Sequence, residues 1–205
     1  MKKVFVLLLA VICSISLCCC KETTDVEKSD SQNHESVFDS VPDLTVVCTD
    51  KSVKALKGTT TWTYTLDNGT GQSFCSDSMH PLQAVEYMES LSLLPSQYSR
   101  FKPLAATLMF DKASPDKVTV RCWDESCIDK PDSPATEIEV QAIEVDFADG
   151  TWGVDYTCDL LDGNYIYEVI AEWNTNESYN GVVRYSFYTV KSDMTIYPID
   201  NIQKK

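Results

Sequence analysis

Apolar and polar residues alternate with a period of two along most of residues 41–191. In the stretch TTTWTYTLDNGTG, Trp62, Tyr64 and Leu66 fall on one phase ahead of a turn rich in Asn and Gly. Successive side chains of a β-strand point to opposite faces of its sheet, so this alternation predicts strands that bury one face. We therefore expect a series of short strands joined by turns.

Further runs with the same alternation follow one another along the chain. The apolar residues that share a phase within each run are Leu44, Val46 and Cys48; Leu104, Ala106, Leu108 and Phe110; Val118, Val120 and Cys122; Trp152, Val154, Tyr156 and Cys158; Tyr165, Tyr167, Val169, Ala171 and Trp173; and Val183, Tyr185 and Phe187. About eight short strands without alternating helices favour an all-β, antiparallel sandwich over a parallel sheet. In EIEVQAIEVDF the apolar phase changes from even to odd positions after Ala142, which predicts a bulge or a turn.

One segment, HPLQAVEYMESLSLL, departs from this alternation. Its apolar residues Leu82, Val85, Met88 and Leu91 recur at helical spacing, and Pro81 suits the first turn of a helix. The sequence therefore predicts one short helix near residues 82–91.

The first residues have the pattern of a secretion signal. Lys2 and Lys3 precede an apolar run over residues 4–17, and no further charge appears until Lys21. The run is shorter than the roughly 20 apolar residues that span a bilayer as a helix. Export is therefore favoured over a transmembrane anchor.

The end of this run, Leu17-Cys18-Cys19-Cys20, resembles the cleavage site of bacterial lipoprotein signal peptides. The resemblance implies removal of residues 1–19 and diacylglycerol attachment to Cys20. Cys18 and Cys19 stand where that family usually has Ala, Ser or Gly. A plain secretory signal and an uncut anchor are the alternatives.

Composition then divides the rest of the chain. Residues 20–41 are rich in Ser, Asp and Glu and poor in apolar side chains, which predicts a flexible acidic tether that includes His34. Residues 42–191 form the predicted sandwich domain, and residues 192–205 a C-terminal tail. The 31 Asp and Glu residues exceed the 17 Lys and Arg residues, for a net charge of −14. Nucleic acid is thereby excluded as a partner.

Two stretches carry a resemblance to a fold family. LLDGNYIYEVIAEW resembles the penultimate long strand of immunoglobulin-like and fibronectin type III domains, and VRCWD is similar to their central strand. The resemblance implies an immunoglobulin-like sandwich in which the Tyr167 hydroxyl reaches back to the upstream backbone. It also implies that Val169 points inward and that Trp123 lies in the core.

A wider resemblance runs from KGTTTWTY through SDSMHPLQ and LMFDKASPDKVTVRCW to YNGVVRYSFYTV. These stretches are similar to uncharacterised lipoproteins of low-GC Gram-positive bacteria. They also resemble the extracytoplasmic C-terminal regions of relatives of the antibiotic-sensing M56 metallopeptidases. The chain has no HExxH motif, so the resemblance implies a location and a sensing or scaffolding role, without protease activity.

The cysteines downstream of Cys20 are odd in number, in a compartment that favours disulfides. They are Cys48, Cys75, Cys122, Cys127 and Cys158. We predict a disulfide between Cys122 and Cys127, which are nearest in sequence, with a bond between Cys48 and Cys75 as a second option. The alternative is that Cys48, Cys122 and Cys158 are buried thiols, because each shares the apolar phase of its strand.

Candidate catalytic groups are few. Cys75 and His80 lie close in sequence, but no nucleophile signature surrounds them. Carboxylate pairs that would suit glycoside hydrolysis are Asp146 with Asp149, and Glu168 with Glu172. We assign no catalytic, cofactor or metal residue.

The sequence as a whole predicts a lipoprotein held at the outer face of a bacterial cell membrane. Its domain should be a non-catalytic binding, sensing or scaffolding module for a protein or glycan ligand. The alternative is a cell-envelope or glycan hydrolase that uses a carboxylate pair.

Overall fold

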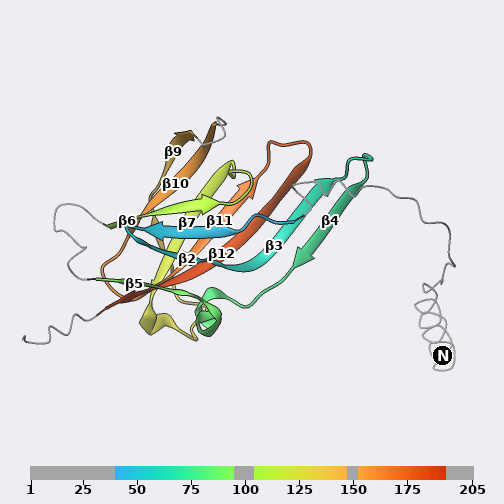
Figure 1. Ribbon diagram of the computed structural model, residues 1–205. Helices are drawn as coiled ribbons and strands as arrows, with labels where there is room; N and C mark the ends of the chain where they lie inside the picture. Colours follow the sequence, from blue (N-terminus) through green and yellow to red (C-terminus); the bar gives the residue numbers. More distant parts are fainter. Residues whose placement is uncertain (1–39, 95–103, 147–151, 193–205) are drawn as a thin grey trace, which may run out of the picture. The chain divides into compact units, whose positions relative to one another are not determined.

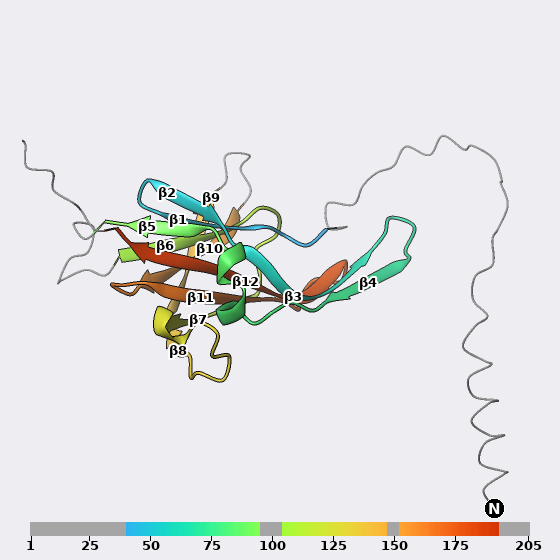
Figure 2. The same cartoon turned by 90° about the horizontal axis from the view of Figure 1, so that it is seen from below.

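The computed structural model describes residues 40–94, 104–146 and 152–192, which form two β-sheets (Figures 1 and 2). The five-stranded sheet has the order β2-β1-β6-β10-β9. The seven-stranded sheet has the order β4-β3-β12-β11-β7-β8, and β5 adds to it by pairing with β12. The strands are β1 (Leu44–Cys48), β2 (Lys51–Lys54), β3 (Leu56–Thr65), β4 (Gly71–Ser76), β5 (Ser90–Leu93), β6 (Leu104–Phe110), β7 (Lys117–Asp124), β8 (Thr136–Ile138), β9 (Val140–Asp146), β10 (Trp152–Leu160), β11 (Tyr165–Trp173) and β12 (Tyr179–Lys191). The predicted all-β, antiparallel sandwich is confirmed, and β5 with β12 is the one parallel pair among these strands.

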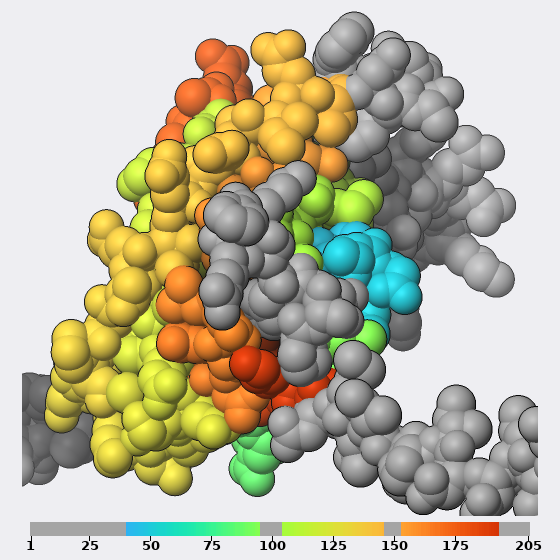
Figure 3. All heavy atoms as spheres, turned by 90° about the vertical axis from the view of Figure 1, so that its left-hand side faces the viewer, coloured from blue at the N-terminus to red at the C-terminus, as the bar shows by residue number. Residues whose placement is uncertain are grey.

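The core lies between the two sheets and contains the apolar phases of the alternating runs. On β11, Tyr167, Val169 and Ala171 are fully buried, and Trp173 is almost so. Trp62 meets the Trp173 ring edge-on, with 5.3 Å between ring centroids. Two buried tyrosine hydroxyls donate to backbone carbonyls: the Tyr156 Oη to Pro115 at 2.6 Å and the Tyr185 Oη to Pro42 at 2.8 Å. In the space-filling view, the yellow segment after β7 and the blue β1–β2 hairpin lie on opposite sides of the orange strands (Figure 3).

The corner before β11 has the hydrogen bond that the immunoglobulin-like resemblance implied. The Leu161 amide donates to the Tyr167 hydroxyl at 2.8 Å. Val169 points inward, as expected. Trp123 differs, because it is buried on the opposite face of the seven-stranded sheet, where its Nε1 donates to the Ser133 carbonyl at 3.0 Å. The immunoglobulin-like type stays a prediction.

The predicted helix near residues 82–91 is wrong. The segment forms two short 3₁₀ turns, η1 (Pro81–Gln83) and η2 (Val85–Tyr87), followed by β5. Leu82 packs on the outer face of the seven-stranded sheet, whereas Leu91 and Leu93 alternate into the inter-sheet core. The helical spacing therefore arose from two different packing faces that follow each other in the sequence.

The predicted bulge or turn after Ala142 is wrong, because β9 pairs with β10 in unbroken register across Ala142 and Ile143. The chain crosses between the sheets just before β9. β8 pairs with β7 in the seven-stranded sheet, and β9 pairs with β10 in the five-stranded sheet, so the chain changes sheets at Glu139. The break comes earlier than the phase of the apolar residues suggested. β9 is an edge strand, and Ile143 on it is 45% exposed, so its alternation does not report burial.

The predicted Cys122–Cys127 disulfide is not formed, and both thiols are free. Cys122 faces the inter-sheet core, whereas Cys127, in the 3₁₀ turn η4 (Glu125–Cys127), packs on the outer face. Cys48 and Cys75 are free as well. The alternative of buried thiols is confirmed for Cys48, Cys122 and Cys158. Burial raises the pKa of the Cys122 thiol to about 11 and that of Cys158 to about 12, so both stay protonated at neutral pH.

Several predictions about the ends of the chain concern residues that the structure does not describe. The signal peptide over residues 1–19, the acylated Cys20, the tether up to residue 39 with His34, and residues 193–205 of the C-terminal tail lie outside the described residues. Val41, the last residue of the predicted tether, is instead buried in the core. Within the described ranges, no helix has the length and apolar character needed to cross a membrane.

Candidate functional site

The outer face of the seven-stranded sheet carries charged side chains at the centre of the sheet. Three adjacent strands, β7, β11 and β12, contribute Arg121, Glu168 and Arg184, each on the polar phase of its strand. The register places Glu168 opposite Arg121 on one side and opposite Ser186 on the other. The antiparallel pairing therefore brings together three residues that lie far apart in sequence.

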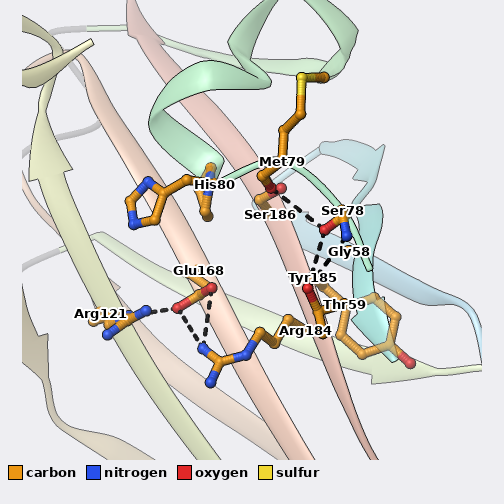
Figure 4. A pocket seen from close by; sticks show the side chains of 11 residues that line it. Gly58, Thr59, Ser78, Met79, His80, Arg121, Glu168, Arg184, Tyr185 and Ser186 are labelled. Carbon is orange, nitrogen blue, oxygen red and sulfur yellow. Dashed lines mark hydrogen bonds and ion pairs between the residues drawn. The ribbon is translucent and has the colours of Figure 1, made fainter. Parts of the chain in front are cut away.

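These side chains line a pocket of about 310 Å³, which we call the anion pocket (Figure 4). Strands β3, β7, β11 and β12 and the segment that leads into η1 form its walls. The residues that line it are Gly58, Thr59, Ser78, Met79, His80, Pro81, Arg121, Glu168, Arg184, Tyr185 and Ser186. Its volume lies at the lower end of the range typical of small-molecule sites.

Glu168 is the buried centre of the anion pocket. Its side chain is only 3% exposed, and its carboxylate accepts hydrogen bonds from the Arg121 Nε and from the Arg184 Nη1, which lies 3.3 Å from both oxygens. A buried carboxylate is costly unless it is paired and hydrogen-bonded, and the two guanidiniums supply that pairing. Glu168 thereby fixes both arginines on the sheet.

The charges of this group do not cancel. Arg121 and Arg184 carry two positive charges, and Glu168 is the one carboxylate ion-paired to them within residues 40–94, 104–146 and 152–192. The excess positive charge stands on a chain whose net charge is −14. The Arg121 guanidinium also lies over the Trp123 ring, 5.1 Å from its centroid, which is a cation–π arrangement.

His80 adds a neutral donor to the wall of the anion pocket. Its Nδ1 accepts the Leu82 amide at 3.2 Å, so the neutral ring carries its proton on Nε2. The ring lies edge-on to Trp123, with 5.2 Å between centroids. Burial, together with the positive charges of Arg121 and Arg184, lowers the pKa of His80, and the opposing effects of Glu168 and Asp132 do not reverse the shift. His80 is therefore neutral at pH 7.

Two guanidiniums held by one carboxylate are suited to binding an anionic group. Each guanidinium has five N–H donors and no acceptor, and Glu168 occupies only part of this set. Arginine forks match the oxygens of carboxylate, sulfate and phosphate groups, with charge-assisted hydrogen bonds. The pocket therefore offers an anionic group donors that are already held in place.

Of the two carboxylate pairs considered for hydrolysis, the structure describes only Glu168 with Glu172, and these two carboxylates do not meet. Glu168 and Glu172 lie four residues apart on β11, which puts them about 13 Å apart at the usual strand rise. Glycosidases need their two carboxyl groups within about 5–9.5 Å. Glu172 instead pairs with Lys117 at 2.7 Å, and the hydrogen bond from Lys117 lowers its pKa. Asp149 and the side chain of Asp146 lie outside the described residues.

Cys75 with His80 as nucleophile and base, and metal binding, are the other chemistries to compare with the structure. Cys75 is exposed on β4, and the contacts and charges that act on His80 come from Leu82, Trp123, Glu168, Asp132 and the two arginines. The described part of the chain has no cluster of His, Cys, Asp and Glu that could hold a metal ion.

Sequence reasoning named Glu168 and His80 but passed over Arg121 and Arg184. The rarity of arginine could have pointed to these two residues, because the chain has only three arginines, Arg100, Arg121 and Arg184. Two of the three lie on the polar phase of buried strands, where lysine would serve equally well for solubility alone. Their meeting across Glu168 depends on the strand order, which alternation does not encode.

Comparison with known proteins found no relative of this chain. The sequence matches no protein-family model and no curated protein, and no solved structure matches the chain. The residues of the anion pocket are therefore the basis from which a function can be inferred.

Proposed function

We propose that this protein is a non-catalytic binding module that takes the anionic group of a small ligand between Arg121 and Arg184. The observation that carries the proposal is Glu168, a buried carboxylate that holds two guanidiniums in one pocket and leaves an excess of positive charge. A structural ion pair needs only one arginine to balance one carboxylate. The second arginine is the feature that favours a ligand.

The fixed geometry favours binding over non-specific attraction. Immobilising a flexible side chain on binding costs about 0.5–1.5 kcal/mol, and Glu168 has already reduced the freedom of both arginines. The overall negative charge repels anions at long range, but this repulsion is screened beyond about 8 Å at physiological salt. Contact hydrogen bonds in a partly buried site are screened much less, so they decide the affinity.

We further propose that the module works at the outer face of a bacterial cell membrane, held there by a lipid on Cys20. The support is the sequence of the first residues, where a basic start and an apolar run end at Leu17-Cys18-Cys19-Cys20. Acyl chains add about 0.8 kcal/mol for each buried CH₂. Mass spectrometry of the membrane-bound protein should find an acylated Cys20, and Cys20→Ala should release the chain from membranes. An unmodified amino terminus in the membrane-bound protein would contradict the anchor.

The binding test is calorimetry of the full chain in lipid nanodiscs, titrated with acetate and with sulfate. We expect saturable binding, weakened roughly tenfold or more by Arg184→Gln, because a hydrogen bond to a charged group contributes about 1.5–3 kcal/mol. Lys117→Gln is the matched control, since Lys117 lies on the same sheet face, is 63% exposed and pairs with Glu172. Equal affinity of Arg184→Gln and wild type would contradict the proposal.

A further inference from the structure

A second pocket, of about 470 Å³, adjoins the anion pocket. We call it the apolar pocket. Its apolar walls are Leu56, Met79, Ala84 and Tyr87. Its two charged lining residues, Lys57 and Asp77, are opposite in sign. This second space therefore has no net charge of its own.

The two pockets are neighbours, because they share wall residues. Gly58, Ser78, Met79 and Ser186 line both. A Cβ at Gly58 would lie 3.0 Å from the Ser78 Oγ and 3.2 Å from the Arg184 carbonyl oxygen, so the glycine permits the close approach of the segment to the sheet at this junction. The shared walls therefore place the apolar pocket beside the arginines that line the anion pocket.

Exposed apolar side chains gather at this second pocket. Met79 is 53% exposed and Tyr87 is 59% exposed, and both line it. The other large hydrophobic residues exposed in the described ranges lie apart on separate strands, namely Phe74 on β4, Met109 on β6 and Ile143 on β9. Single exposed apolar residues are ordinary, but two beside a charged pocket form a surface that an apolar group would cover.

We propose that the ligand is an amphiphilic anion whose carboxylate or sulfate head lies between Arg121 and Arg184. Its apolar body lies in the apolar pocket against Met79, Ala84 and Tyr87. This inference rests on the proposed function, because the arginines must first hold the head group. The charge complementarity at one end and the neutral, apolar walls at the other select a molecule with both parts.

The test is a chain-length series of acetate, butanoate, hexanoate and octanoate, titrated calorimetrically into the full chain in nanodiscs with empty nanodiscs as the blank. Each methylene that enters the apolar pocket should tighten binding about fourfold, with a plateau once the pocket is filled. Hexyl sulfate compared with hexanoate distinguishes the two head groups. Hexanol, which lacks the charge, should bind at least tenfold more weakly than hexanoate.

Variants separate the two parts of the proposal. Met79→Ser and Tyr87→Ser should both flatten the dependence on chain length. Tyr87→Ser should also leave acetate affinity unchanged within about twofold, because of the two pockets Tyr87 lines only the apolar one, whereas Met79 lines both. Met109→Ser is the matched control, because Met109 is similarly exposed, at 43%, on a strand of the other sheet. We expect it to bind the whole series like the wild type.

The results that would contradict these expectations bear on different parts of the account, namely the amphiphilic ligand and the binding of an anion. Octanoate that binds no more tightly than acetate would overturn this inference and leave the proposed function standing. Absence of binding by every acid in the series would overturn both. Octanoate binding that survives Arg121→Gln and Arg184→Gln together would show association through the tail alone, which contradicts the head-group assignment.

Discussion

The two faces of the seven-stranded sheet differ in what their side chains do. Toward the five-stranded sheet, β11 presents Tyr167, Val169 and Ala171, which are fully buried among apolar neighbours. On the opposite face the same strand presents Glu168, which is as deeply buried but surrounded by charge. One strand therefore supports the fold with its odd positions and contributes Glu168 to a polar pocket on its other face.

The outer face becomes a pocket because other segments cover part of it. Leu82 of η1 packs against Trp123 and Ile166, and this outer cluster holds the segment before η1 against the sheet. The His80 imidazole reinforces the arrangement by accepting the Leu82 amide. Changes on the inner face should therefore affect stability first, whereas changes on the outer face should affect binding first.

The largest expected effect is on the inner face, at Trp173. Its ring packs edge-on against Trp62 and Phe110, and its Nε1 donates to the Ala113 carbonyl at 3.0 Å. Trp173→Ala should lower the free energy of unfolding by about 3–5 kcal/mol, because it leaves a cavity in the core. Urea denaturation measures this loss, and a decrease below about 1 kcal/mol would contradict the inner-face account.

The next largest effect on the free energy of unfolding is expected at Glu168, which lies on the outer face of the strand whose inner face carries Tyr167 and Val169. Glu168→Gln removes the charge that pairs both arginines. Removing one partner of a buried pair costs about 3–5 kcal/mol, and since Arg121 and Arg184 are 32% and 39% exposed, we expect about 1–3 kcal/mol by urea denaturation. Glu172→Gln is the control, and it should cost at most about 1 kcal/mol, because its partner Lys117 is largely exposed. Equal losses for the two variants would show that the buried pair has no special role.

A smaller effect is expected from one hydroxyl in the core. Tyr167→Phe removes the acceptor of the Leu161 amide hydrogen bond without changing the ring that stacks on Phe187. The loss in the free energy of unfolding should be about 1 kcal/mol. Acetate affinity should be unchanged, which distinguishes this inner-face variant from Arg184→Gln. A tenfold loss of acetate affinity in Tyr167→Phe would show that the two faces are not independent.

The smallest effect concerns the pH dependence of stability through His80. Burial lowers the pKa of His80 below its ordinary value of 6.5, so the unfolded chain binds a proton more readily than the folded chain. Its contribution to stability is therefore constant above about pH 7. It falls as the pH drops from 6.5 through the lowered pKa of the folded protein. His80→Gln should flatten this part of the stability curve, measured by urea denaturation between pH 7.5 and 5. An unchanged curve would contradict the neutral state assigned to His80.

Much of the inner face was predictable from sequence, because alternation reports which residues are buried between sheets. Trp62, Tyr167 and Trp173 were expected to face the core, and all three do. The expected helix failed where Leu82 and Leu91 serve different faces, since a periodicity count assumes that one face receives all the apolar residues. For the same reason the expected place of Trp123 in the inter-sheet core was wrong. Trp123 lies on the polar phase of β7 and is buried on the outer face of the sheet.

The anion pocket was less predictable. Glu168 appeared among many carboxylates as one half of a hydrolytic pair with Glu172, and the structure instead pairs it with Arg121 and Arg184. Those arginines are separated by more than sixty residues of sequence and meet only because β7 and β12 flank β11. Strand order depends on the packing of the whole domain, so no local pattern in the sequence specifies this meeting.

The central claim is that the two arginines on the outer face bind an anion. Nuclear magnetic resonance of the arginine side-chain Nε–H groups tests it most directly, with acetate titrated into the full chain. We predict saturable shifts of the Arg121 and Arg184 signals at a common affinity. Shifts that fail to saturate, or that saturate at different affinities for the two arginines, would contradict the claim.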